Sequence, residues 1–423
     1  MARLFVLLGG TLLLALGMWF YVSKPFPKSS PTQGPLDSAG VQADQKLPKN
    51  RVVRSSPRYK PVSKFAANPS AFFERAEVLV SSRDKDIQTA AEIYGFRLIE
   101  KTHLQSLKIS LHRLKAPAGF NVKRARRTLV SRFPTASVDA NHHFQIQQQA
   151  TFRITARSAA KWSAASPSCG RNIRIGLIDT AVDLNHSALQ GQRIRYQSFH
   201  HDGYAPGPHN HGTAIAGVLV GKPEWGGLLP GAQLFAANVD SLRRNGELVG
   251  NAVSIAKAID WMVNNKVHVI NMSFAGANNK IVHDAIQKAE RQGIAIVAAA
   301  GNWGLGSERA YPAAYTEVLA VTALSSNGKR VASFSNRGEY IDFAAPGSQI
   351  WAPIPGGGGR YLSGTSFAAP YISVLSALFT AKGGRKTAEN LRQLFRPQIK
   401  DLGAKGKDSS FGYGVVMSQP KCI

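Results

Sequence analysis

The hydrophobic and polar positions alternate in two different ways along the chain, and each way predicts a separate folded region. Between residues 71 and 150, short alternating apolar runs predict four strands, interrupted by two stretches with helical spacing. The β-α-β-β-α-β order is that of the split βαβ motif, so 71–150 is expected to form a small α+β, ferredoxin-like unit. The predicted strands cover 77–80, 96–99, 107–111 and 137–147, and the predicted helices cover 84–94 and 122–132.

In the second region, 171–423, the apolar runs are longer and nearly continuous. Apolar strands separated by helices indicate a mostly parallel sheet covered on both faces, which is a three-layer α/β domain. Ligand sites of such sheets lie beyond the carboxyl ends of the strands, so the residues that follow each strand are the candidates for function. The predicted strands cover 173–178, 233–239, 267–272, 294–300 and 318–323, and the predicted helices cover 251–263 and 279–292.

The first 70 residues have neither pattern. A nearly unbroken apolar run at 4–22 is about long enough to cross a bilayer as a helix. We favour an uncleaved signal anchor over 1–23, because the aromatic residues 19–21 would continue past a cut at the small residues 15–17. A cleavable signal peptide is the alternative, and either segment predicts export. Residues 24–70 are rich in proline and in basic side chains, which predicts an extended basic linker.

The net charge of +27 on 423 residues is large. It predicts attraction to anionic surfaces such as phospholipid headgroups or cell-wall polymers, although solubility and the basic linker explain it equally well. No nucleic-acid motif accompanies the charge, so nucleic acid is not an expected partner. Residues 151–170 are rich in Ala and Ser without clear periodicity, which predicts an exposed connector that a protease can reach.

Four polar residues of complementary chemistry stand where predicted strands end or predicted helices begin. Asp179 and Asn302 each follow an apolar strand, while His211 and Ser366 stand in glycine-containing turns that lead into apolar helices. Pro370 is tolerated only near a helix start, so its helix is expected to begin close to Ser366. Each residue alone fits an ordinary structural role. Together, an acid, an imidazole, an amide and a hydroxyl are the groups that nucleophilic acyl transfer requires.

Five sequence blocks resemble the motifs of the subtilisin-like serine proteases, the subtilases. The blocks are Leu177-Ile178-Asp179-Thr180, His211-Gly212-Thr213, Val269-Ile270-Asn271-Met272-Ser273, Ala299-Ala300-Gly301-Asn302 and Gly364-Thr365-Ser366-Phe367-Ala368-Ala369-Pro370. They follow the subtilisin order of acid, histidine and serine. The resemblance, which covers roughly 171–416, implies a subtilisin-like domain with a triad of Asp179, His211 and Ser366. It also implies that Asn302 is a donor of the oxyanion hole.

The resemblance further implies a cleft in which a polypeptide substrate lies as an extended strand between two edges of the domain. The pocket for the P1 side chain, which precedes the scissile bond, would be apolar and without an acid, so apolar P1 residues are expected. The residues implied to contact substrate are Val249, Gly250, Ser273, Phe274, Ala275, Gly276, Ala299, Ala300, Gly301 and Ala310.

The unit at 71–150 contains no candidate catalytic group and by itself fits a folding module, a binding module or an inhibitory prodomain. The resemblance favours the prodomain, because many subtilases have a β-α-β-β-α-β prodomain whose tail blocks the cleft. It implies an exported zymogen of a serine endopeptidase, inhibited by its own prodomain, that cleaves itself between Gln145 and Ser168. One alternative is an inactive subtilase-like binding or scaffolding protein of the cell envelope. An esterase is a weaker alternative, because no Gly-x-Ser-x-Gly turn surrounds Ser366.

The two cysteines, Cys169 and Cys422, flank the predicted catalytic domain. In an exported protein a disulfide between them is expected, with two free thiols as the alternative. No metal or cofactor is predicted, since the cysteines lack metal-ligand spacing and the loop at 222–227 lacks the calcium-binding insertion of many relatives. The catalytic domain is expected outside the cytoplasm, either secreted or associated with the membrane through 4–22.

Overall fold

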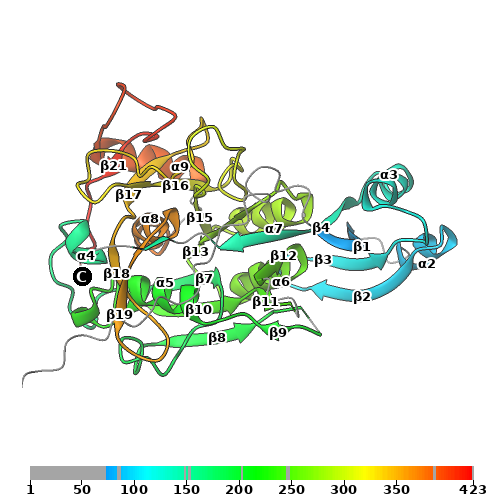
Figure 1. The fold of residues 1–423 in the computed structure, drawn as a ribbon, viewed down its shortest axis with the longest axis horizontal. Helices are drawn as coiled ribbons and strands as arrows, with labels where there is room; N and C mark the ends of the chain where they lie inside the picture. The colour runs from blue at the N-terminus through cyan, green and yellow to red at the C-terminus, as the bar shows by residue number, and fades with distance from the viewer. Residues whose placement is uncertain are drawn as a thin grey trace, which may run out of the picture. The chain divides into compact units, whose positions relative to one another are not determined.

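A computed structural model describes residues 73–82, 87–146, 149–150, 154–201, 203–243, 248–383 and 387–421, all within one compact unit, Lys60–Ile423 (Figure 1). The predicted signal segment at 1–23 and linker at 24–70 lie outside the described residues. Among the helices of these described ranges, none combines the length and the apolar character needed to cross a membrane.

The N-terminal part of this unit has the predicted β-α-β-β-α-β order. Its strands pair in the order β2-β3-β1-β4, and Asn121 caps α3 by accepting the N–H of Arg124 over 2.8 Å. A separate core that includes Val78, Val80 and Leu129 fills the space between strands and helices. The elements are β1 (Phe73–Ser82), α2 (Ile87–Ile93), β2 (Arg97–Leu104), β3 (Ile109–Lys115), α3 (Val122–Arg132) and β4 (Ser137–Ile146).

A nine-stranded sheet forms the centre of the second region. Its order is β20-β21-β17-β16-β15-β13-β7-β10-β8, and all neighbours are parallel except β20 and β21. The mostly parallel sheet predicted from the apolar runs is therefore confirmed. The strands are β7 (Arg174–Asp179), β8 (Ile194–Ser198), β10 (Gln233–Asn238), β13 (Val269–Met272), β15 (Ala295–Ala299), β16 (Leu319–Leu324), β17 (Phe343–Pro346), β20 (Ile399–Lys400) and β21 (Val415–Val416).

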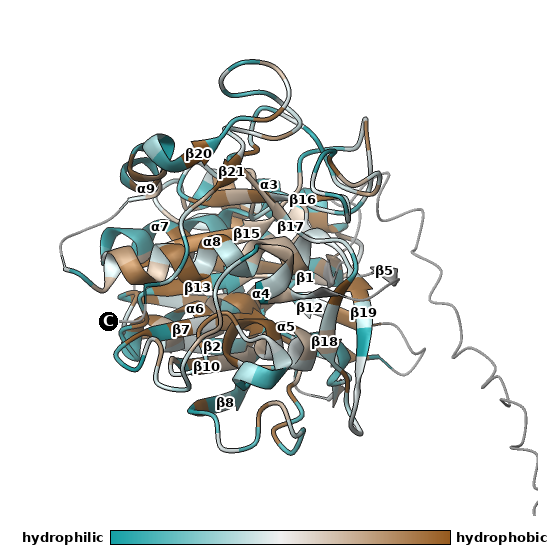
Figure 2. Ribbon diagram, turned by 90° about the vertical axis from the view of Figure 1, so that its left-hand side faces the viewer, coloured by the Kyte–Doolittle hydropathy of each residue, from teal (hydrophilic) through white to brown (hydrophobic). Residues whose placement is uncertain are grey.

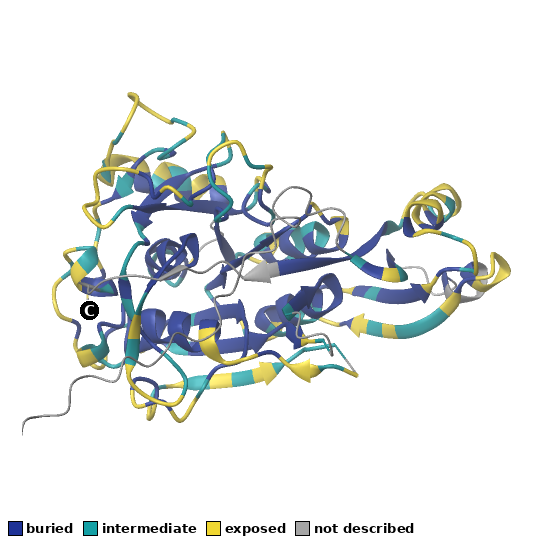
Figure 3. Ribbon diagram, viewed as in Figure 1, coloured by how far each residue is buried: buried dark blue, intermediate teal, exposed yellow. Residues whose placement is uncertain are grey.

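Helices cover both faces of this sheet, which gives the three predicted layers. On β7, Ile175 and Leu177 join one core and Ile178 joins the other, because successive strand residues point to opposite faces. The first core includes α5 (Asn210–Val220), α8 (Thr365–Thr380) and α9 (Ala388–Phe395), and the second includes α6 (Ala252–Asn264) and α7 (Lys280–Arg291). The central strands are hydrophobic in Figure 2 and buried in Figure 3.

Shorter elements surround the central sheet. Strands β12, β11 and β9 continue from β4, which also pairs with β14, and a separate sheet has the order β5-β19-β18-β6. These elements are β5 (Gln149–Ala150), β6 (Ile154–Thr155), α4 (Ala156–Ala159), β9 (Ala205–Pro206), η2 (Pro223–Trp225), β11 (Asp240–Leu242), β12 (Leu248–Asn251), β14 (Phe274–Gly276), β18 (Ile350–Pro353), β19 (Gly359–Ser363) and η3 (Arg396–Gln398).

Between 158 and 168 only Ala165 is buried, in keeping with the exposed connector expected from composition, but other parts of the segment 151–170 pack against the catalytic domain. Its strand β6 pairs with β18, and Ala156, Ala165 and Cys169 are buried in the core. The side chain of Arg157 is also buried. A two-residue strand is too short to show a hydrophobic period in the sequence. It is held in place by backbone hydrogen bonds to a neighbouring strand, which the side-chain pattern does not reveal.

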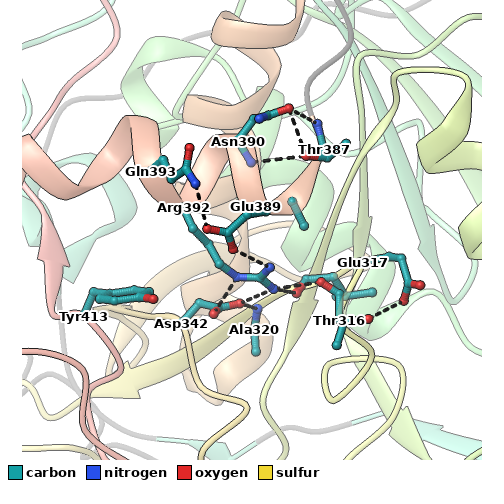
Figure 4. Close-up of polar contacts among 12 residues, drawn as sticks. Thr316, Glu317, Ala320, Asp342, Thr387, Glu389, Asn390, Arg392, Gln393 and Tyr413 are labelled. Atoms are coloured by element: carbon teal, nitrogen blue, oxygen red, sulfur yellow. Dashed lines mark hydrogen bonds and ion pairs between the residues drawn. The ribbon is translucent and has the colours of Figure 1, made fainter.

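A buried ion pair attaches α9 to the sheet, as Figure 4 shows. Arg392 donates from Nε to Asp342 Oδ1 over 2.8 Å and from Nη2 to Asp342 Oδ2 over 3.1 Å. The same Nη2 donates to the carbonyl of Val318 over 2.8 Å, and Asp342 Oδ2 accepts the N–H of Ala320 over 3.0 Å. The pair therefore connects the helix to the strand β16 and the segment before it.

Candidate active site

The four predicted catalytic residues all lie where elements of the central domain begin or end. Asp179 is the last residue of β7, and Asn302 lies in the turn after β15. His211 is the second residue of α5 and Ser366 the second residue of α8. Asp179, His211 and Ser366 are buried. The parallel sheet thus brings together groups that are far apart in the sequence.

Asp179 and His211 form a direct hydrogen bond. The distance from His211 Nδ1 to Asp179 Oδ1 is 2.7 Å, and the same oxygen accepts the N–H of Thr180 over 2.7 Å. Gly212 allows this approach, since a Cβ at that position would lie 2.4 Å from the carbonyl oxygen of Thr180. A carboxylate at Nδ1 favours the tautomer with its proton there, which leaves Nε2 as a proton acceptor. His211 Nε2 is buried and has no hydrogen-bond partner among the described residues.

Ser366 stands at the start of α8, whose first residue is Thr365, as the position of Pro370 predicted. The Ser366 hydroxyl donates to the carbonyl of Ser273 over 3.1 Å. Because Pro370 has no N–H to offer four residues back, the carbonyl of Ser366 accepts the hydroxyl of Ser273 instead, over 3.3 Å. The Ser366 side chain is therefore held against Ser273, the single residue between β13 and β14.

Asn302 is oriented by Thr365. Its Oδ1 accepts the N–H of Thr365 over 3.0 Å and the Thr365 hydroxyl over 2.8 Å. With its oxygen engaged, the amide leaves Nδ2 buried and without a hydrogen-bond partner in the described part of the chain. A buried, unpaired donor beside the positive end of a helix is suited to bind an oxygen atom that becomes negatively charged.

Two residues near this site were not assigned a role from the sequence. Thr365 lies inside the sequence block 364–370, but Asn302 belongs to the block 299–302. Nothing in the sequence near either residue indicates that the two side chains are in contact. Asp240 is buried, and burial together with the negative charge of Asp179 raises its pKa well above the ordinary range. From the sequence, Asp240 is a single aspartate after a predicted strand, and nothing indicates that it lies close to Asp179 in the folded protein.

Strand β4 of the N-terminal unit lies between the two predicted substrate-binding edges. It pairs antiparallel with β12 through Phe144 and Gly250, and with β14 through Phe144 and Gly276. The ring of Phe144 packs edge-on against Phe274, with centroids 5.6 Å apart. Gly276 makes room for it, since a Cβ there would lie 2.5 Å from the Phe144 ring. Val249 and Ala275 lie on the same two edges.

The residues predicted to line a P1 pocket are gathered beside Asn302. Ala299, Ala300, Gly301 and Ala310 are buried. Gly301 has φ +101°, and a Cβ there would lie 3.0 Å from Ala310 Cβ and 2.6 Å from Asn336 Nδ2. A glycine is thus required both by the backbone and by the close neighbours. These lining residues carry no charged side chain.

Cys169 is buried and disulfide-bonded. Cys422, the other cysteine of the chain, lies outside the described residues, so its pairing stays a prediction. Across the ranges that the structure describes, no group of three or more His, Cys, Asp and Glu side chains is arranged to hold a metal ion.

This arrangement of sheet, helices and polar groups is of the subtilisin-like α/β class. Comparison with known proteins agrees, because residues 170–414 match the model of the subtilase family. The chain belongs to this family, the subtilisin-like serine proteases.

Relatives with known names are proteases. The minor extracellular protease Epr of Bacillus subtilis (strain 168) is 36% identical over 254 residues, which are 58% of this chain and 38% of Epr. The thermostable alkaline protease of Halalkalibacterium halodurans is 30% identical over 369 residues, 83% of this chain and 94% of that protein. The chain therefore spans well under half of Epr and nearly all of the alkaline protease.

A solved structure with the same fold is that of fervidolysin from Fervidobacterium pennivorans, described as a keratinolytic enzyme related to subtilisin. It superimposes with a TM-score of 0.67 at 22% sequence identity, over 81% of this chain and 60% of that chain. At this identity the likeness is one of fold alone.

Proposed function

We propose that the protein is a serine endopeptidase that hydrolyses polypeptides through an acyl-enzyme. The single observation that carries the proposal is the 2.7 Å hydrogen bond between Asp179 and His211, which leaves the buried Nε2 of His211 without a partner. The imidazole lies close to the start of α8, with its ring 6.1 Å from that of Phe367, the residue after Ser366.

The reaction begins when the Ser366 oxygen attacks a peptide carbonyl and its proton passes to His211 Nε2. Asp179 stabilises the imidazolium that forms. The Asn302 amide, held by Thr365, donates to the oxygen of the tetrahedral intermediate. His211 then gives the proton to the leaving amine. Water attacks the acyl-enzyme in the second half of the reaction, and His211 takes a proton from the water and returns it to the Ser366 oxygen as the ester bond breaks.

Polypeptide substrates and a zymogen form are supported by the position of β4. A strand that pairs with β12 on one side and β14 on the other makes the contacts expected of an extended substrate. The N-terminal unit therefore acts as an intramolecular inhibitor until it is removed. Export is supported by the apolar segment at 4–22 and by relatives such as Epr, which is named as an extracellular protease. We extend the proposal to attachment of the precursor to the membrane through that segment.

A fluorophosphonate probe tests the proposal directly, because it labels only a serine that is activated as a nucleophile. The chain is expressed at full length and allowed to mature, and wild type is compared with Ser366→Ala and with Ser373→Ala, a buried serine of the same helix. Labelling at Ser366, retained in Ser373→Ala and lost in Ser366→Ala, is expected. Absence of labelling in mature wild type would refute the endopeptidase and leave an inactive subtilase-like binding protein.

A further inference from the structure

A second buried acid, Asp240, lies beside the substrate-binding edge β12 and takes no part in the triad. It is only 4% exposed, and its carboxyl forms no hydrogen bond or ion pair with any residue that the structure describes. Burial and the negative charge of Asp179 raise its pKa well above the ordinary range. A buried acid without a partner is costly to the folded protein, which is consistent with a partner supplied by a ligand.

Asp240 belongs to a row of residues that crosses four neighbouring strands. It is opposite Gly250 on β12, and Gly250 is opposite Phe144 on β4. Phe144 is in turn opposite Gly276 on β14. Residues directly opposite one another in antiparallel strands point to the same face of the sheet. Asp240 therefore faces the same side as Phe144, the residue of β4 that packs into the second core of the catalytic domain.

Gly250 leaves the carboxyl of Asp240 open towards the strand that lies between the two edges. A Cβ at Gly250 would lie 2.7 Å from Asp240 Oδ1 and 3.7 Å from the carbonyl oxygen of Phe144. No side chain at position 250 therefore separates the carboxyl from that strand. A substrate that replaces β4 has the same edge beside it, so a long side chain of the substrate can reach the carboxyl.

Two positions of a substrate in the place of β4 share the face of Asp240. The first is the place of Phe144, where the ring of Phe274 forms an apolar site. The second is the substrate residue paired with Phe274, two residues further along. It is the second residue before the scissile bond, because the next position is opposite Ser273, whose carbonyl accepts the Ser366 hydroxyl.

We infer that Asp240 selects substrates with lysine or arginine as the second residue before the scissile bond. Asp240 follows Val239, whose N–H donates to the carbonyl of Asp179 over 3.0 Å, so it stands at the catalytic end of the face. An ammonium or guanidinium group at this end pairs with the Asp240 carboxylate and offsets its repulsion from Asp179. The inference rests on the proposed function, because it names the substrate class of the same site.

The expected cleavage site combines a basic residue with apolar neighbours. The lining residues beside Asn302 carry no charged side chain, so the residue directly before the bond is apolar. The place of Phe144 takes a further apolar residue, the fourth before the bond. Asp240 thus adds a charge requirement to a cleft that otherwise recognises the backbone and apolar side chains.

The test compares two fluorogenic peptides that differ only in the second residue before the bond. One has lysine there and the other norleucine, which is uncharged and similar in shape to the lysine stem. For the mature wild-type enzyme, prepared from the full-length chain, kcat/KM should be about 10–100-fold higher for the lysine peptide, the factor that a hydrogen bond between charged groups provides. In Asp240→Asn the ratio of the two kcat/KM values should fall to about one. Asp401→Asn, which removes an exposed acid of the same domain, is the matched control and should keep the wild-type ratio.

The outcomes separate this inference from the proposed function. Equal kcat/KM for the two peptides, in an enzyme whose Ser366 reacts with the fluorophosphonate probe, would overturn the role of Asp240 and leave the endopeptidase standing. A lysine preference that survives in Asp240→Asn would show that another group binds the cation. A third peptide, with glutamate at the same position, tests wild type alone and should be cleaved more slowly than the norleucine peptide; equal rates would also contradict the inference. No cleavage of any peptide together with no labelling would refute the endopeptidase itself.

Discussion

The hydroxyl of Thr365 donates to Asn302 Oδ1 over 2.8 Å, so the residue before Ser366 orients the side-chain amide of Asn302, the proposed oxyanion donor. The same hydroxyl accepts the N–H of Gly301 over 3.2 Å. One buried side chain thus connects the turn after β15 to the first residue of α8. The direction in which the Asn302 amide donates depends on this contact.

Replacing Thr365 by Val is expected to lower kcat with little change in KM. Valine keeps the shape but removes the hydroxyl, so the Asn302 amide loses one of its two anchors and the Gly301 N–H loses its acceptor. We expect kcat to fall by about tenfold or more, against roughly 10²–10³ for removal of an oxyanion donor as in Asn302→Ala, a magnitude known from subtilisin. Steady-state kinetics on a peptide substrate measures both constants.

Thr365→Ser provides the matched control, because serine retains the hydroxyl and should keep kcat within about twofold. The unpaired Gly301 N–H also predicts that Thr365→Val loses about 1–3 kcal/mol in stability. A Val variant with unchanged kcat, or a Ser variant as slow as Val, would show that Thr365 does not act through its hydroxyl.

The identities of the four catalytic candidates could be predicted from the sequence, but their hydrogen bonds could not. Asp179, His211, Asn302 and Ser366 each lie in a recognisable block, and a parallel sheet brings strand ends together whatever lies between them. Which oxygen of Asp179 meets His211, and that Thr365 rather than water orients Asn302, depends on rotamers. Those are decided by packing between blocks that are distant in sequence.

The contacts of Glu74 with His143 and Arg243 predict that the N-terminal unit is held less firmly to the catalytic domain at low pH. Burial opposes ionisation of Glu74, but hydrogen bonds from His143 and Arg243 outweigh it and lower the pKa of Glu74 from 4.5 to about 2. Arg243 Nη2 lies 2.6 Å from Glu74 Oε1, and His143 Nε2 lies 3.2 Å from it. A lowered folded-state pKa contributes stability that is complete above pH 4.5 and is lost as the pH falls towards 2.

The measurement is thermal unfolding of the uncleaved Ser366→Ala precursor as a function of pH, with and without Glu74→Gln. Without the charge, the second variant should be less stable at neutral pH by about 1.5–3 kcal/mol, the range for hydrogen bonds to charged groups. Its loss between pH 4.5 and 2 should be smaller than that of the parent. Parallel pH profiles for the two proteins would contradict the assignment to Glu74.

The ion pair between Arg392 and Asp342 predicts a large and local loss of stability (Figure 4). The Asp342 side chain is 1% exposed and that of Arg392 is 12% exposed. Removing Arg392 leaves the buried Asp342 carboxylate with Lys407, whose Nζ lies 3.5 Å from Asp342 Oδ1, as its remaining ion-pair partner. Loss of one partner of a buried pair costs about 3–5 kcal/mol, so Arg392→Met should cost up to about that much. Chemical denaturation of the Ser366→Ala form measures it.

Glu389→Gln is the control for this pair. Glu389 also approaches Arg392, at 3.6 Å, but its side chain is 55% exposed. An exposed pair contributes about 0–1 kcal/mol, so this variant should unfold nearly like its parent. Equal losses in the two variants would mean that burial of Asp342 does not set the cost.

The central layers of the fold could be predicted from the sequence, whereas its edges could not. The strand at 294–300 is apolar throughout because β15 is buried on both faces, and that pattern is visible without a structure. By contrast, β5, β6 and β9 are two residues long, and partners distant in sequence determine that they pair at all.

The buried Asp240 is expected to make the folded protein less stable as the pH rises, whereas Glu74 makes it less stable as the pH falls. Burial, and then the charge of Asp179, raise the pKa of Asp240 well above 3.8. A raised folded-state pKa means that the folded protein holds this proton more tightly than the unfolded chain. The resulting stability is complete below pH 3.8 and is lost as the pH rises through the folded-state pKa. Asparagine imitates the protonated acid in shape but cannot ionise.

Asp240→Asn in the Ser366→Ala background should therefore match its parent at acidic pH and become progressively more stable than the parent as the pH rises above 3.8. Thermal unfolding of both proteins across this range measures the difference. Asp240→Leu is a less suitable variant, because Gly250 and Gly207 approach the side chain closely and extra volume would displace them. A constant difference at every pH would mean that Asp240 is ionised alike in the folded and unfolded states, and that Asp179 carries its charge without a protonated neighbour.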